Sequence, residues 1–145
     1  MKIIGRRDVI DLPDLQLTGI EAKVDTGAYG NALHCHHIEL MMKDNVETLR
    51  FKLLDPSHPE YEDRYFYFSE FNEKKVKSSS GQVENRYTIK TRLTIFDNNF
   101  TTQFSLTDRQ EMKYPVLLGR KFLRKKFIVD VSLKNVSHKA KHQVK

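Results

Sequence analysis

The chain has 145 residues, of which 39% are apolar and 30% charged, a balance typical of one compact globular domain and not of a disordered protein. No segment has the apolar length needed to span a bilayer, and Arg6, Arg7 and Asp8 interrupt what would be the apolar core of a secretory signal. The single cysteine, Cys35, rules out an internal disulfide, so the sequence predicts a cytoplasmic protein with no membrane partner.

The apolar residues recur mostly with a period of two, which is typical of strands. Strands are expected over residues 3–12, 20–24, 48–54, 65–71, 87–96, 100–106, 116–118 and 127–131. Residues 77–82 predict an exposed hairpin tip, and Asp97-Asn98-Asn99 predicts a turn. Many short strands with one late helix, over residues 120–126, indicate an all-β domain that forms a small barrel or a closed sandwich.

Basic residues account for the net charge of +6 and gather late in the chain. One group is Arg120, Lys121, Arg124, Lys125 and Lys126; the other is Lys134, Lys139, Lys141 and Lys145. The second group lies in residues 134–145, a basic polar tail that could be disordered, beyond a domain of residues 1–133. The clusters are either a solvated surface with a frayed tail or a site that attracts a polyanion, such as an acidic peptide or nucleic acid.

The central motif is a strand that delivers Asp25 into a tight turn made by Thr26 and Gly27. Glycine permits the turn and lets backbone N–H groups approach the carboxylate. The threonine hydroxyl can hydrogen-bond the neighbouring backbone. Alone, the triplet could equally be an ordinary turn between strands, in which an aspartate caps its own backbone.

A second motif, residues 115–120, places an apolar strand and Gly119 just before the predicted helix. Together with the Asp25 turn, it resembles the retropepsin-like acid proteases. In that fold an apolar strand passes close behind the catalytic loop, and its glycine leaves room for the loop.

Further strings narrow the resemblance to the bacterial family named ATP-dependent zinc proteases, a domain of unknown function classed as retropepsin-like. They are residues 23–28, 32–34, 79–81, 84–86, 106–109 and 117–120, within a similarity that runs from about residue 5 to residue 131. The resemblance implies a closed acid-protease barrel with one short C-terminal helix. The family often accompanies enzymes that ligate glutamate onto proteins, which implies a peptide or protein substrate of acidic character. The chain departs from the family at Tyr29-Gly30-Asn31, where small hydroxylated residues are usual.

The resemblance also implies the site residues. Asp25, Thr26 and Gly27 would be catalytic, and the substrate-binding candidates are Lys23, Ala28, His34, Ser80, Gly81, Glu84, Arg86 and Arg109. Residues 78–84 would be the flap that closes over substrate, or else an ordinary exposed loop. Lys23 shares a strand face with Asp25, and Glu84 shares one with Arg86, so these charges either grip an acidic substrate or form structural ion pairs.

One aspartate motif per chain predicts two chains per active site. Aspartic peptidases need two carboxylates that share a proton, and this sequence carries a single Asp-Thr-Gly triplet. A homodimer with two-fold symmetry would bring one Asp25 from each copy to the axis.

Other chemistries have weaker support. Residues 34–37 read His-Cys-His-His, but neighbours in a strand point to opposite faces, so no catalytic zinc or other metal is expected. His34 is expected to hydrogen-bond near the Asp25 loop, and Cys35 to be a small buried residue and not a nucleophile. No Walker-type loop supports ATP binding, so no cofactor is expected.

The alternative function is a non-catalytic basic barrel that binds acidic peptide or nucleic acid. No known RNA-binding motif supports nucleic acid as the ligand.

Overall fold

The computed structural model describes residues 1–77, 80–108 and 113–142. The strands are β1 (Lys2–Ile4), β2 (Arg7–Leu12), β3 (Leu17–Val24), β4 (Asn31–Lys43), β5 (Val46–Leu53), β6 (Tyr65–Phe68), β7 (Asn72–Lys77), β8 (Val83–Ile95), β9 (Asn98–Thr107), β10 (Val116–Leu118) and β11 (Phe127–Val129). The helices are η1 (Pro13–Leu15), α1 (Arg120–Leu123) and α2 (Val136–His142). Within these residues no helix is both long and apolar enough to cross a membrane.

Six strands close into a mixed barrel in the order β10–β3–β2–β8–β9–β4, and β4 pairs back with β10 to complete the ring. β10 runs parallel to β3 and antiparallel to β4, while β4 runs parallel to β9. The predicted closed, mostly β barrel is therefore confirmed.

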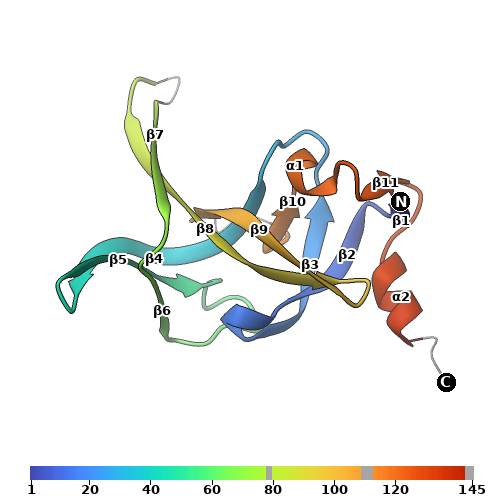
Figure 1. Ribbon diagram of the computed structural model, residues 1–145, viewed down its shortest axis with the longest axis horizontal. Helices are drawn as coiled ribbons and strands as arrows, with labels where there is room; N and C mark the ends of the chain where they lie inside the picture. The colour runs from blue at the N-terminus through green and yellow to red at the C-terminus, as the bar shows by residue number, and fades with distance from the viewer. Residues whose placement is uncertain (78–79, 109–112, 143–145) are drawn as a thin grey trace.

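Two long strands belong partly to the barrel and partly to hairpins that leave it. The first half of β8 pairs with β7, and the later part of β4 pairs with β5, so both hairpins project from the barrel in Figure 1. β6 extends the β4–β5 sheet. β1 and β11 form a separate parallel pair.

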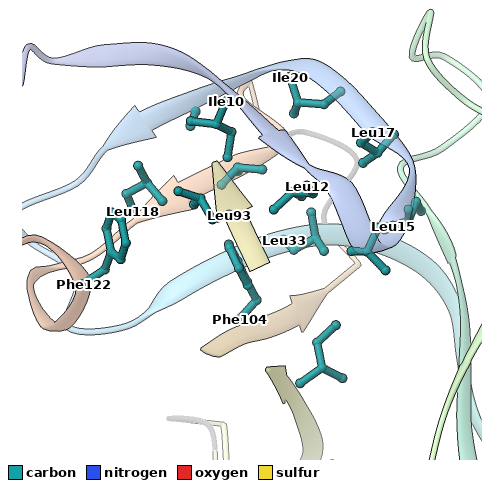
Figure 2. Packing of buried hydrophobic residues seen from close by; sticks show 14 of the residues in the cluster. Ile10, Leu12, Leu15, Leu17, Ile20, Leu33, Leu93, Phe104, Leu118 and Phe122 are labelled. Carbon is teal, nitrogen blue, oxygen red and sulfur yellow. The ribbon is translucent and has the colours of Figure 1, made fainter. Parts of the chain in front are cut away.

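Alternating apolar residues of the barrel strands fill its interior. Figure 2 shows Ile10 of β2, Ile20 of β3, Leu33 of β4, Leu93 of β8 and Phe104 of β9 converging on one core. Each is at most 1% exposed. Most of the buried residues of these strands are apolar, so the sheet closes with the face that carries them inward.

The structure corrects two expectations about helices. The predicted helix over residues 120–126 ends at Leu123, and the C-terminal part is not a loose tail, because residues 136–142 form a second helix, α2. The buried Asp8 carboxylate of β2 accepts the backbone N–H groups of Ser137 (2.8 Å) and His138 (3.2 Å). These are first-turn donors that have no partner inside the helix, so a residue 129 positions away fixes α2.

The longest strand missing from the sequence prediction is β4. Its residues Leu33, His34, Cys35 and His36 are all buried, so the polar-apolar alternation that marks a half-exposed strand is lost.

Candidate active site

Asp25 follows the last residue of β3, and its backbone and carboxylate are both fixed. Its N–H donates to the carbonyl of Leu118 in β10 (2.9 Å), and its carbonyl accepts the N–H of Ala28 (3.2 Å). Its Oδ1 accepts the N–H of Gly27 (3.0 Å), as the Asp-Thr-Gly turn predicts. The side chain is half-buried, so this positioned carboxylate still reaches solvent.

Gly119 leaves the space that the loop occupies, as expected from the sequence. A Cβ at this position would lie 2.4 Å from the carbonyl oxygen of Gly30 and 2.7 Å from that of Tyr29. Both atoms belong to backbone and cannot rotate away. Only glycine therefore fits between β10 and α1 while residues 29–30 stay in place.

Asn31 ties the end of the loop to β9 and to Gly119, which follows β10, a role that the sequence analysis missed. The side chain is 5% exposed. Its Oδ1 accepts the N–H of Gly119 (2.9 Å), and its Nδ2 donates to the carbonyl of Gln103 (2.9 Å) and to Thr102 Oγ1 (3.2 Å). The departure from the family pattern at Tyr29-Gly30-Asn31 was the one signal that pointed to this position.

α1 holds the loop from its other side. The N–H of Arg120 donates to the carbonyl of Ala28 (2.9 Å), and its Nη1 donates to the carbonyl of Thr26 (2.9 Å). The Arg120 guanidinium also lies over the Tyr29 ring, 5.9 Å from its centroid. Thr26 is itself exposed, and its carbonyl makes the contact with α1.

Two cations lie beside the loop on the outer face of β3. Lys23 is exposed and pairs across the sheet with Arg7 of β2, so the two side chains share a face. Arg7 Nη1 donates to Tyr114 Oη (3.2 Å), and this hydrogen bond lowers the pKa of the Tyr114 phenol. Arg7 Nε is buried without a hydrogen-bond partner among the described residues. Neither Arg7 nor Tyr114 was predicted, because their proximity depends on strand pairing.

The candidate flap residues lie on the β7–β8 hairpin. Gly81 sits near its tip with φ of +86°, a conformation that favours glycine, and Ser80 precedes it. Glu84 and Arg86 form an exposed ion pair (Oε1–Nε 3.2 Å), as the structural alternative predicted. The 350 Å³ cavity beside them is lined from β4, β8, β9 and Asp108, and residues 23–28 do not line it. Arg109 and residues 78–79 lie outside the described residues.

The structure places His34 away from the Asp25 loop. The N–H of His34 donates to the carbonyl of Pro115, whereas the N–H of Asp25 donates to that of Leu118. The two acceptors are three positions apart in the chain, roughly 10 Å of extended backbone. His34 is buried, with Nε2 2.6 Å from Asp55 Oδ2. The hydrogen bond from the Ser57 hydroxyl has the largest effect on the pKa of Asp55, and the hydrogen bond with His34 adds to it. Together they lower this pKa to about 2, although burial opposes the shift.

The histidine-rich segment, residues 34–37, does not form the zinc site that the name of the resembled family suggests. Nδ1 of His36 lies 2.6 Å from the carbonyl oxygen of Leu54, and the His34 ring is engaged with Asp55. No group of three candidate ligands gathers anywhere in the part of the chain that the structure covers. Cys35 is fully buried, as expected, and burial raises the pKa of its thiol well above the usual value, which opposes a nucleophilic role.

Comparison with known proteins agrees with this geometry. The family model "RimB-like: Retropepsin-like aspartic endopeptidase RimB" matches residues 3–140. Two curated proteins, each described as a "Probable alpha-L-glutamate ligase", are similar: one from Parasynechococcus marenigrum at 30% identity over 88% of this chain, and one from Desulfotalea psychrophila at 29% over 91%. The chain spans only 28% of the length of each. A crystal structure of a Legionella pneumophila protein of unknown function aligns with a TM-score of 0.73 and 29% identity, covering 94% of this chain and 98% of that one.

Proposed function

The chain belongs to the RimB-like family of retropepsin-like aspartic endopeptidases, and from this membership we propose that two copies of it hydrolyse peptide bonds between their Asp25 carboxylates. The observation that carries the proposal is the Asp25 loop itself. Its carboxylate reaches solvent, while β10, α1 and the buried Asn31 hold the loop from three sides. Such fixation keeps a catalytic group in a reactive position.

Two facing carboxylates would share one proton, because two negative charges in contact are unfavourable. The ionised Asp25 takes a proton from a water molecule as that water attacks the amide carbon. The protonated Asp25 gives its proton to the carbonyl oxygen, which forms a tetrahedral diol. The Asp25 that took the proton of the water then gives it to the amide nitrogen, while the other Asp25 removes a proton from a hydroxyl of the diol. The C–N bond breaks, acid and amine leave, and the pair again holds one proton, without a covalent intermediate.

An exposed apolar patch supports a second copy at this end of the barrel. Ile3 of β1 pairs with Ile128 of β11, and they are 48% and 55% exposed; Val131 nearby in the chain is 72% exposed. The carbonyl of Arg6, two residues after β1, accepts the N–H of Val24 next to Asp25. A short two-stranded sheet with open edges and apolar side chains is a surface that a second copy can cover.

The substrate we propose is an acidic peptide, such as a glutamate-bearing protein tail. Lys23 of β3 and Arg7 of β2 place two positive charges on the same face of the sheet, close to the end of β3 that leads into Asp25. Arg7 Nε has no acceptor within the described structure. The glutamate ligases that match this chain make the link between glutamate and this domain reasonable.

Replacement of Asp25 by Asn tests the function, because it preserves the shape of the loop but removes the ionisable group. Peptide cleavage should fall to background, while binding of an acidic peptide should persist. Cleavage by Asp25→Asn at the wild-type rate would refute the aspartic mechanism. A wild-type protein that binds acidic peptide or nucleic acid, but cleaves no member of a broad peptide library, would favour the binding-module alternative.

A further inference from the structure

A cavity of 450 Å³ lies next to the active-site loop, on the outside of the barrel between β8, β9 and α1. Three lysines reach it from different elements: Lys90 from β8, Lys121 from α1 and Lys126 from the turn that follows α1. No carboxylate lines it. A concave site with three ammonium groups and no acid attracts anions.

These lysines are also not neutralised elsewhere. None of the ion pairs formed within residues 1–77, 80–108 and 113–142 includes any of the three. Lys126 is the most constrained, because its Nζ donates to the carbonyl of Phe122 (3.0 Å). Lys90 and Lys121 are exposed, so their ammonium groups are available to a ligand.

The rest of the lining suits carboxylates better than nucleotides. Threonine, serine and glutamine side chains of β8 and β9 supply neutral donors. The two aromatic residues, Phe100 and Phe122, meet edge to face with centroids 5.5 Å apart, and Phe122 is 2% exposed. Phe122 therefore offers no free face on which single-stranded nucleic acids could stack, and Phe100 also packs edge to face against Phe127.

The cavity is continuous with the loop that carries Asp25. Gly30 and Asn31 form part of its wall, and the N–H of Lys121 donates to the carbonyl of Tyr29 (2.8 Å). A ligand in the cavity would thus contact the C-terminal end of the loop that carries Asp25.

We propose that this cavity is an anion subsite that binds acidic side chains of the peptide substrate several residues from the bond that is cleaved. The inference rests on the proposed peptidase function and extends it. Lys23 and Arg7 act next to the scissile bond, and Lys90 and Lys121 act on the flanking sequence. Because the subsite contacts the substrate in the ground state and in the transition state alike, it lowers KM and leaves kcat unchanged.

The test uses peptides with one cleavage sequence, extended at either end by glutamates or by glutamines. Wild-type enzyme should show a lower KM for a glutamate-extended peptide. The double variant Lys90→Gln/Lys121→Gln should lose this advantage, with KM rising roughly 1.5- to 5-fold for each lysine removed and kcat unchanged. Lys90→Glu/Lys121→Glu should prefer the glutamine extension. Lys43→Gln/Lys139→Gln, which removes two exposed lysines elsewhere, should behave as wild type.

Binding to the Asp25→Asn protein, measured by fluorescence anisotropy, separates failure of this inference from failure of the peptidase proposal. If the Lys90/Lys121 double variant keeps the full glutamate preference in KM and in binding, the subsite is refuted even though cleavage stands. If Asp25→Asn still cleaves, the mechanism falls, and the binding difference still decides the subsite. Tighter binding of an oligonucleotide of equal charge, lost in the double variant, would overturn the peptide assignment in favour of nucleic acid.

Discussion

Replacement of Gly119 by alanine tests how the loop is positioned. The new Cβ would lie 2.4 Å from the carbonyl oxygen of Gly30, whereas an ordinary contact begins at 3.4 Å. The loop or β10 must therefore move by roughly 1 Å, and overpacking of this kind costs about 1–3 kcal/mol. A displacement of about 1 Å at a catalytic group costs on the order of a hundredfold in rate.

The expected result is a fall in kcat of roughly a hundredfold, at a temperature where circular dichroism shows the variant to be folded. Gly30→Ala is the matched control, because a Cβ at Gly30 has no atom within 4 Å and its φ is not in the left-handed region. Its free energy of unfolding should stay within about 0.5 kcal/mol of wild type, and its activity should stay well above that of Gly119→Ala. Wild-type kcat and stability in Gly119→Ala would refute the argument that Gly119 sets the loop position.

Three other predictions concern buried polar contacts. Asn31→Ala removes the three hydrogen bonds of a buried amide. In urea titrations the free energy of unfolding should fall by roughly 2–4 kcal/mol. A loss below about 0.5 kcal/mol would contradict the role of Asn31 in holding the loop. Asp8→Ala should lower the free energy of unfolding by about 1–2 kcal/mol and should speed amide hydrogen exchange in α2 but not in β4. Unchanged exchange at Ser137 would argue against Asp8 as the N-terminal cap of α2. The folded-state pKa of Asp55, about 2, lies below its usual 3.8, so its contribution to stability is present above about pH 4 and is lost as pH falls toward 2. Ser57→Ala should therefore destabilise the protein at pH 6, and its difference from wild type should shrink between about pH 4 and pH 2; a pH-independent difference would contradict this assignment.

The Asp25 turn and the strand behind it were predictable because their signals are local. Asp25 and Gly27 lie two residues apart, and residues 116–118 with Gly119 form one apolar string, so short-range patterns specify both. The structure adds only how they meet, through the hydrogen bond from the Asp25 N–H to the carbonyl of Leu118.

The parts that were missed depend on contacts between distant segments. Arg7 lies beside Lys23 only because β2 pairs with β3 in a register that sets the two residues opposite each other. α2 depends on Asp8, and its short basic sequence carries little helix signal of its own. His34 was expected near the Asp25 loop, but its side chain pairs with Asp55. Asp55 is 21 residues away in the chain, and nothing in the local sequence links the two.

The central claim, that two Asp25 carboxylates from two copies form one active site, is tested most directly by mixing subunits. Wild-type and Asp25→Asn protein would be combined in equal amounts, allowed to exchange subunits, and assayed for peptide cleavage at constant total concentration. If both carboxylates are required, only pairs of two wild-type subunits are active, and the activity should be about one quarter of that of the wild-type protein alone. An activity of about one half, falling linearly with the fraction of Asp25→Asn, would show that each chain works alone and would contradict the account.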